Sequence, residues 1–248
     1  MKEWITGRNP VYETIRAKRR QLFSLWVARG VQEKGRLDEI LELSTSLDLK
    51  VEWVPRSQIE SLGSGHQGVA LEVSSYPYCD LFDILESANQ HGEPPLILIL
   101  DTLQDPQNLG TLLRTAEVVG VHGILLPYRR TATVTPAVVS ASSGASEHLL
   151  ITQTNLAQAI GALKDEDIWI IGLDGGPEGQ APDEIRLDGA LALVVGNEGE
   201  GMRRLVKESC DLLLRLPMRG QIDSLNAAIA GSVALYLAWQ ARSYKGFL

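Results

Sequence analysis

Hydrophobic residues follow two different patterns in this chain, and the two patterns alternate. A continuous apolar run such as 96–100 is typical of a strand buried on both faces, whereas apolar residues three or four positions apart are typical of a helix. We predict buried strands over five segments, 96–101, 123–127, 168–174, 190–196 and 211–217. Helices are predicted over 108–120, 136–145, 156–167, 201–208 and 224–245. This alternation predicts an α/β fold with a parallel sheet covered on both faces.

The beginning of the chain shows a shorter version of the same alternation. Strands are predicted at 21–28, 49–54 and 68–73, and helices at 11–18, 33–47 and 56–62. Proline and glycine then gather on both sides of a short predicted helix at 79–90, which is typical of a linker. We therefore expect a small N-terminal α/β domain (1–74), a linker (75–95) and a C-terminal parallel-sheet domain (96–248).

Composition excludes several classes of protein. Hydrophobic residues make up 44% and charged residues 22% of the chain, which is ordinary for a folded domain and excludes a disordered one. No apolar run reaches the roughly 18 residues of a membrane span, and the N-terminus lacks a signal-peptide stretch, so we expect a cytoplasmic protein and no membrane partner. Two cysteines and four histidines without metal spacing predict neither a disulfide framework nor a metal site.

Charge is distributed unevenly along the chain. The net charge is −8, yet residues 1–36 contain nine basic and three acidic residues. A basic segment on an acidic protein still attracts phosphate, because charges act over about 8–10 Å at ordinary salt. The candidate contacts are Arg16, Lys18, Arg19 and Arg20. A solvated helix end would show the same cluster.

Three polar segments follow predicted strands of the C-terminal domain, where parallel sheets bind their ligands. They are residues 105–114, 196–201 and 216–226. Each has a structural explanation by itself: Asp105, Asn108 or Ser224 could cap a helix, and the glycines could serve turns. Dinucleotide-binding, P-loop and hydrolase-elbow motifs do not occur in the sequence.

Together the three segments resemble a known family. DPQNLGTLLRTA, VVGNEGEGM and LPMRGQIDSLNAAIA, with SSGASEHL between the first two, resemble motifs of the SpoU branch of the SPOUT methyltransferases, which methylate RNA ribose 2′-hydroxyl groups. GRNPVYETI, which contains Arg8, and His66-Gln67-Gly68 are similar to the substrate-binding domain of the TrmH-like members, itself similar to ribosomal RNA-binding proteins. The two-domain layout most resembles the bacterial 23S rRNA guanosine 2′-O-methyltransferases.

The resemblance implies an S-adenosyl-L-methionine (SAM)-dependent enzyme with a trefoil knot in its C-terminal domain. It implies a homodimer whose active sites are shared, each taking its arginine from the partner subunit. The cofactor residues that it implies are Leu173, Gly175, Gly196, Gly201, Leu216, Met218 and Leu225. The active-site residues that it implies are Asn108, Arg114, Glu198, Ser224 and Asn226. Arg8 joins Arg16, Lys18, Arg19 and Arg20 as expected RNA contacts.

The expected roles of these side chains follow from the chemistry of methyl transfer, which needs an aligned 2′-hydroxyl that loses its proton. In the family the arginine is proposed as the base, but guanidinium stays protonated in proteins. Arg114 could instead hold an RNA phosphate or stabilise developing alkoxide charge. Glu198 is expected to orient Arg114, and Asn108, Ser224 and Asn226 to fix the ribose and the loops.

The resemblance implies a guanosine of 23S rRNA as the substrate, and the distinct α/β N-terminal domain favours rRNA over tRNA. Two alternatives stay open at this point. One is a tRNA ribose 2′-O-methyltransferase. The other is a non-catalytic RNA-binding protein that uses the N-terminal domain.

Overall fold

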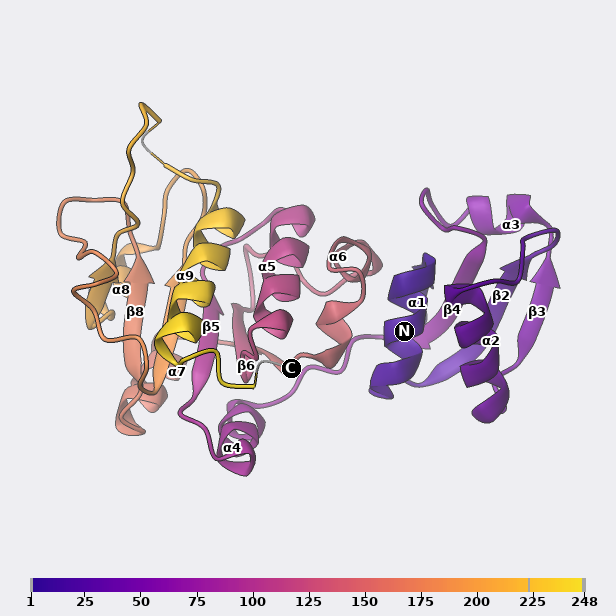
Figure 1. Ribbon diagram of the computed structural model, residues 1–248, viewed down its shortest axis with the longest axis horizontal. Coiled ribbons are helices and arrows are strands. Elements are labelled where there is room, and N and C mark those ends of the chain that lie inside the picture. The colour runs from indigo at the N-terminus through magenta and orange to yellow at the C-terminus, as the bar shows by residue number, and fades with distance from the viewer. Residues whose placement is uncertain (1, 223, 247–248) are drawn as a thin grey trace. The chain divides into compact units, whose positions relative to one another are not determined.

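Figure 1 shows the computed structural model, which describes residues 2–222 and 224–246. Its contacts divide the chain into two compact units. Unit 1 comprises Met1–Pro77 and Val134–His148, and unit 2 comprises Tyr78–Thr133 and Leu149–Leu248. The contacts of Val134–His148, which we expected within the C-terminal domain, therefore lie in the N-terminal unit.

Unit 2 is built on a six-stranded parallel sheet with the strand order β10-β8-β9-β5-β6-β7. The strands are β5 (Leu96–Leu100), β6 (Gly123–Pro127), β7 (Ile151–Thr154), β8 (Trp169–Leu173), β9 (Leu191–Val195) and β10 (Leu212–Leu214). The helices are α4 (Leu81–His91), α5 (Pro106–Val118), α7 (Leu156–Asp165), α8 (Arg204–Glu208) and α9 (Ala227–Ala241). The prediction of an α/β fold with a parallel sheet is confirmed.

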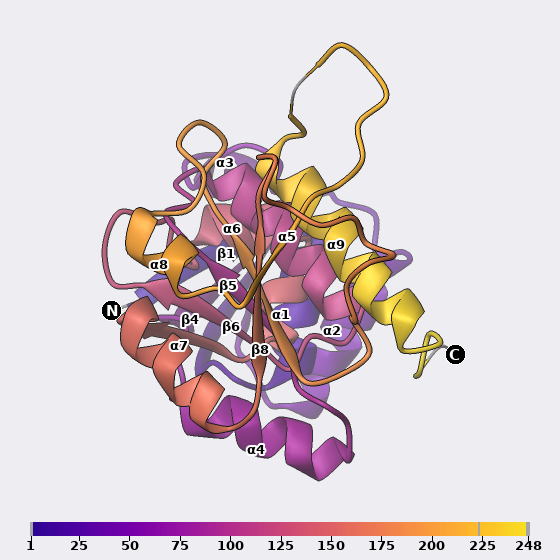
Figure 2. The same ribbon diagram turned by 90° about the vertical axis from the view of Figure 1, so that its left-hand side faces the viewer.

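Helices cover both faces of this sheet. Figure 2 shows α4 and α7 on one side of the strands and α5 and α9 on the other. Side chains of α4, α7 and α8 pack with those of the central strands in one buried cluster. All five residues of β5 and of β9 are buried, which explains their continuous apolar sequence. The sheet thus places β9 between β8 and β5, so the loops that follow these three strands leave the same edge side by side.

Unit 1 contains a four-stranded mixed sheet with the order β1-β4-β2-β3. Its strands are β1 (Lys2–Thr6), β2 (Leu22–Ala28), β3 (Val51–Val54) and β4 (Val69–Ser74). Its helices are α1 (Arg8–Ala17), α2 (Arg36–Ser46), α3 (Arg56–Glu60), α6 (Pro136–Ala141) and the 3₁₀ helix η1 (Ala145–His148). The helices and strands predicted for residues 1–74 are present, and β1, which pairs antiparallel with β4, was not predicted.

Arg20 lies inside unit 1 and joins its two chain segments. Its side chain has no exposed surface, and Nε and Nη2 each donate to a carboxylate oxygen of Glu147 at 2.9 Å. Nη1 donates to Glu3 Oε2 at 2.8 Å and to the Ser74 carbonyl at 3.0 Å. Burial alone would lower the pKa of Arg20, but the bonds and charges of Glu147 and Glu3 raise it above its ordinary value.

This arrangement corrects the expectation that Arg20 binds RNA. A guanidinium that is buried and fully engaged by two carboxylates cannot reach a phosphate. The basic cluster in the sequence contains one structural ion pair beside its exposed members, Arg16 and Lys18.

The Arg20→Met variant is expected to lower the free energy of unfolding by about 3–5 kcal/mol, because it leaves the Glu147 carboxylate buried without its partner. Arg16→Met is the matched control: its side chain is 63% exposed and pairs with Glu13 at 3.5 Å. We expect the control to change the free energy by less than about 1 kcal/mol. Urea unfolding of both variants measures the difference, and equal effects would contradict the buried role of Arg20.

None of the helices in the described part of the chain is long and apolar enough to cross a membrane.

Candidate active site

The loops after β8, β9 and β10 surround a cavity of about 360 Å³ in unit 2. That volume lies within the range of small-molecule sites. All seven residues expected to hold the cofactor line this cavity, namely Leu173, Gly175, Gly196, Gly201, Leu216, Met218 and Leu225. Two of the expected active-site residues, Glu198 and Ser224, line it as well. Ala227 and Ala230 also line it and were missed, because small apolar residues in a helix carry no signal of a site.

Gly196 makes the shape of the central loop possible. A Cβ atom at this position would lie 2.3 Å from the carbonyl carbon of Gly201 and from the backbone nitrogen of Met202. The loop folds back so closely because Asn197 and Gly201 exchange two backbone hydrogen bonds of 3.0 Å. Only glycine fits there, whereas a Cβ atom at Gly199 would meet nothing within 4 Å.

The chemistry of the lining fits SAM. Leucine and methionine side chains and glycine backbone provide the flat apolar contact and the N–H and C=O groups that an adenine needs. Asp174, Glu198 and Glu200 add carboxylates to the same cavity. Acidic groups attract the sulfonium and ammonium cations that SAM carries.

Asn108, Glu198 and Asn226 form a hydrogen-bonded cluster at this edge of the sheet. Asn108 Nδ2 donates to Glu198 Oε1 at 2.9 Å, and Asn226 Nδ2 donates to Asn108 Oδ1 at 3.1 Å. Asn226 Nδ2 also donates to Glu198 Oε1. The structure thus brings together three of the five expected active-site residues, from three different segments of the chain.

Helix caps hold two members of this cluster in place. Asp105 caps α5 by accepting from the backbone nitrogens of Gln107 and Asn108 at 3.1 and 3.3 Å. Asn226 caps α9, since its Oδ1 accepts from Ala228 and Ile229 at 2.9 and 3.2 Å. The last helix therefore begins after Asn226, and the expectation that it begins at Ser224 is wrong.

Arg114 lies on α5. It is on the exposed side of α5, where its neighbours Leu112 and Leu113 are buried, and it is absent from the described residues that line the cavity. The Glu198 oxygen that the cluster uses accepts from Asn108 and Asn226, so an orienting contact between Glu198 and Arg114 stays a prediction.

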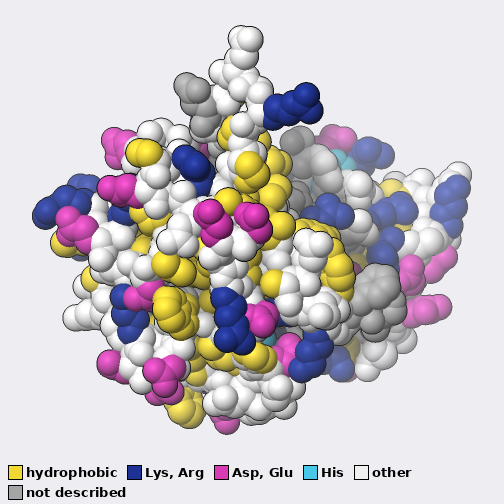
Figure 3. Space-filling model, turned by 60° about the vertical axis from the view of Figure 1, so that its left-hand side comes forward, with side chains coloured by type: hydrophobic (Ala, Val, Ile, Leu, Met, Phe, Trp, Pro, Cys, Tyr) yellow, Lys and Arg dark blue, Asp and Glu magenta, His cyan; other side chains and the backbone are white. Residues whose placement is uncertain are grey.

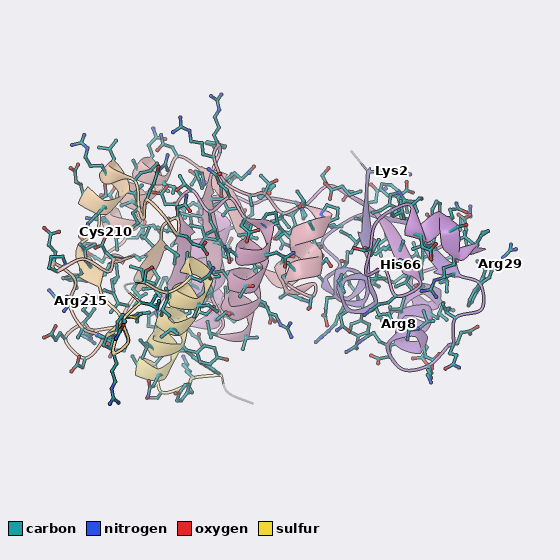
Figure 4. The ribbon with its side chains drawn as sticks, turned by 90° about the horizontal axis from the view of Figure 1, so that it is seen from above. Lys2, Arg8, Arg29, His66, Cys210 and Arg215 are labelled. Atoms are coloured by element: carbon teal, nitrogen blue, oxygen red, sulfur yellow. The ribbon has the colours of Figure 1, made fainter. Side chains whose placement is uncertain are left out.

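The residues expected to contact RNA occupy several places in unit 1. Arg8 lies between two loops, with Nε donating to the Gln67 carbonyl and Nη1 to the Lys34 carbonyl, both at 3.4 Å. Figure 4 shows Arg8 and His66 in this unit. Arg19 is half-buried and donates to the Tyr76 hydroxyl at 3.0 Å and to the Pro77 carbonyl at 3.2 Å. Among the five expected residues, Arg16 and Lys18 are the exposed ones.

Two family models match the chain, one for each part of the sequence. The model of the SpoU rRNA Methylase family matches residues 95–236, and the model described as RNA 2′-O ribose methyltransferase substrate binding matches residues 4–79. The chain belongs to the SpoU rRNA methylase family. It is a SAM-dependent RNA 2′-O-methyltransferase with the family's substrate-binding domain.

Relatives align with nearly the whole chain. A Bacillus subtilis protein named for the TrmH family of tRNA/rRNA methyltransferases is 41% identical over 98% of both chains. A Staphylococcus aureus protein of the same name is 38% identical over 98% of this chain and 97% of its own.

Solved structures share the fold of this family member. The SpoU methyltransferase AviRb from Streptomyces viridochromogenes, in complex with AdoMet (SAM), superposes with a TM-score of 0.81 at 21% identity, covering 100% of this chain and 92% of its own. An AdoMet-bound rRNA methyltransferase from Sinorhizobium meliloti gives 0.78 at 22%, covering 96% and 87%. The A. aeolicus TrmH/SpoU tRNA modifying enzyme gives 0.56 at 25% identity and covers 62% of this chain and 78% of its own.

Proposed function

We propose that this enzyme methylates the ribose 2′-hydroxyl of a guanosine in 23S rRNA. The observation that carries the proposal is the cavity beside the Asn108–Glu198–Asn226 cluster, in a chain that also carries a separate substrate-binding unit. The choice of rRNA over tRNA is supported by the layout of the relatives. The rRNA methyltransferase from Sinorhizobium meliloti aligns with nearly all of this chain, whereas the tRNA modifying enzyme aligns with less than two thirds of it.

SAM supplies the methyl group when it is bound among the seven lining residues named above. The chain's own residues do the positioning. Asn108 and Asn226 share Glu198, so the amide and carboxylate groups hold fixed directions toward a ribose at the cavity edge. Ser224 lies in the same lining. Arg114 carries a permanent positive charge that would bind an RNA phosphate or stabilise the alkoxide as the 2′-oxygen loses its proton.

We further propose a homodimer in which Arg114 acts at the partner subunit's cavity. The last helix supports it: one side of α9 is buried in unit 2, whereas Ile229, Val233 and Tyr236 on the other side are 48, 41 and 45% exposed. An exposed apolar stripe of this kind is typical of a subunit interface. Figure 3 shows hydrophobic side chains reaching the surface among acidic and basic ones on the face that it displays.

The proposal includes the knot and the location in the cell. The chain segments around the cavity are expected to form the trefoil knot of the SPOUT methyltransferases. The cytoplasm, where ribosomal RNA is found, is the expected location.

Loss of a methyl mark in cells tests the choice of substrate. In a strain that lacks the gene, we expect one 2′-O-methylguanosine to disappear from 23S rRNA when ribose methylation is mapped by protection from alkaline hydrolysis. Loss of a tRNA mark would support the tRNA alternative. An unchanged set of marks would support the non-catalytic one.

The two exposed cations at the end of α1, Arg16 and Lys18, give a prediction for RNA binding. The double variant Arg16→Ala/Lys18→Ala is expected to bind RNA more weakly and to flatten the log–log salt dependence, by about 0.7–0.9 for each phosphate that the variant no longer binds. The matched control is Lys50→Ala/Arg56→Ala, which removes the same charge from exposed side chains of the same unit. Filter binding between low and moderate salt gives both slopes, and equal slopes would show that Arg16 and Lys18 do not contact RNA.

A further inference from the structure

Two aspartates directly follow the two strands that flank β9. Asp101 follows β5, and Asp174 follows β8. Each of them binds a cation from the segment that comes after the β9 loop, Arg203 in one case and Lys207 in the other. Neither cation is among the residues that the sequence predicts to form the site. The two ion pairs thus fasten the segment after β9 to both of its neighbouring strands.

The pair on the β5 side is buried at its acidic end. Asp101 has 0% exposed surface, and its Oδ2 accepts from the backbone nitrogen of Arg203 at 2.7 Å. Its Oδ1 accepts from Nε of the same arginine at 2.7 Å. A carboxylate that binds both the backbone and the guanidinium of one residue fixes the position of that residue closely.

The pair on the β8 side forms part of the cavity wall. Lys207 Nζ lies 2.8 Å from Asp174 Oδ2, and Asp174 Oδ1 accepts from the backbone nitrogen of Gly176 at 2.8 Å. Burial would raise the pKa of Asp174, but the bonds from Lys207 and Gly176 lower it below its ordinary value. Asp174 and Gly176 both line the cavity, and Lys207 is not among the described residues that line it. Lys207 therefore binds this wall from outside the cavity.

The two ion pairs lie beside different parts of the site, so we expect a change in each pair to affect a different property. The segments after β5 and β9 are joined at two places, by Asp101–Arg203 and by Asn108–Glu198. A change at Arg203 therefore acts on the cluster that faces the ribose. A change at Lys207 acts on residues 173–176, which face the cofactor.

We propose that Arg203 and Lys207 are positioning residues that form a two-point clasp, Arg203 aligning the Asn108–Glu198–Asn226 cluster and Lys207 shaping the SAM-binding wall. The proposed role of Arg203 in catalysis rests on the proposed function. The proposed role of Lys207 depends only on the binding of SAM.

For the binding arm, Lys207→Met is expected to raise the Kd of SAM about tenfold, the order of a lost charged hydrogen bond, with kcat at saturating SAM within about twofold of wild type. Arg204→Met is the matched control, because this neighbouring cation on α8 is 81% exposed and pairs only with Glu208 among the described residues. Lys207→Arg keeps a charged donor and should restore most of the affinity. Calorimetry gives the Kd of SAM for the wild type and the three variants, and methyl transfer at saturating SAM gives their kcat.

For the catalytic arm, Arg203→Met is expected to lower kcat by roughly 10²-fold while the Kd of SAM changes little, because misplacement of a reacting group by about 1 Å costs that much. Arg203→Lys should recover part of the rate. If both clasp variants lost kcat and affinity in equal proportion, in step with their melting temperatures, the residues would only stabilise the fold and the proposal would be overturned.

Cys210 provides a readout that does not depend on methyl transfer. It follows α8, its thiol donates to the Val206 carbonyl at 3.4 Å, and burial raises its pKa to about 11; Figure 4 shows it in unit 2. Loss of the Lys207 charge by itself would raise the pKa of the Cys210 thiol further and slow its labelling. Faster labelling of cofactor-free Lys207→Met than of Arg204→Met, in a Cys79→Ser background, is therefore expected only if loss of the clasp loosens α8.

The two proposals fail in different ways. If wild-type protein binds SAM but modifies no RNA, the proposed substrate is wrong, while the Kd and labelling of Lys207→Met still decide the clasp. If Lys207→Met matches Arg204→Met in both measurements, the clasp is overturned even when rRNA methylation is confirmed.

Discussion

Gly196→Ala is expected to weaken SAM binding by roughly 10²-fold or more. The added methyl group would lie 2.3 Å from the backbone of Gly201 and Met202, so the loop after β9 could not fold back on itself. The contacts that it gives the cofactor would then be lost, and each 1.4 kcal/mol of lost contact energy weakens binding about tenfold. The central wall of the cavity is made of this loop.

Gly199→Ala provides the control in the same loop. Its Cβ atom would meet nothing within 4 Å, and we expect SAM binding within a few-fold of wild type. Calorimetry with SAM compares the two variants, and circular dichroism confirms that both are folded. Equal affinities would contradict the close approach of Gly196 to Gly201 as the basis of the cavity.

Arg114→Ala is expected to lower turnover by roughly 10²–10⁴-fold, the range for loss of a positioned catalytic group, while SAM binding stays nearly intact. Arg114 is exposed on α5 and is not among the described residues that line the cavity, so we expect SAM binding in its own chain not to depend on it. Methyl transfer and calorimetry on one preparation separate the two effects.

The shared-site arrangement has a direct test in mixed dimers. We would co-express Arg114→Ala and Gly196→Ala chains with different tags and isolate dimers that carry both tags. Each mixed dimer has one site with both defects and one with neither, so about half of the wild-type activity is expected from two-fold symmetry. Inactive mixed dimers would show that each site belongs to a single chain.

The family resemblance named the expected cofactor residues, and their place at one edge of the sheet was accessible from the sequence because its signals are local. Glycine-rich or polar segments directly after buried strands mark the ligand edge of a parallel sheet, and Gly196 and Leu216 both stand there. The same logic predicted β5 and β9, whose apolar runs reflect burial on both faces. The short strands β1 and β7 were not predicted, because four or five partly buried residues do not form a recognisable hydrophobic pattern.

Long-range partners account for most of what the sequence did not show. Arg20 looked like part of an exposed basic cluster, and its burial depends on Glu147, 127 positions later. Arg203 looked like one more surface cation, and its partner Asp101 is 102 positions earlier. The order of charged residues along the chain does not show whether a cation is exposed or is bound by a distant carboxylate. Only the fold brings such a cation and its carboxylate together.

Methyl transfer to defined RNA tests directly whether this protein methylates a ribose 2′-hydroxyl of 23S rRNA, as we propose. Purified protein would be incubated with SAM labelled in its methyl group and with 23S rRNA, 16S rRNA or bulk tRNA from a strain lacking the gene. The RNA would then be digested to nucleosides. We predict label in 23S rRNA as 2′-O-methylguanosine and no label with Arg114→Ala. Label on a base, or label in none of the three RNAs, would show that the protein is not a 23S rRNA ribose methyltransferase.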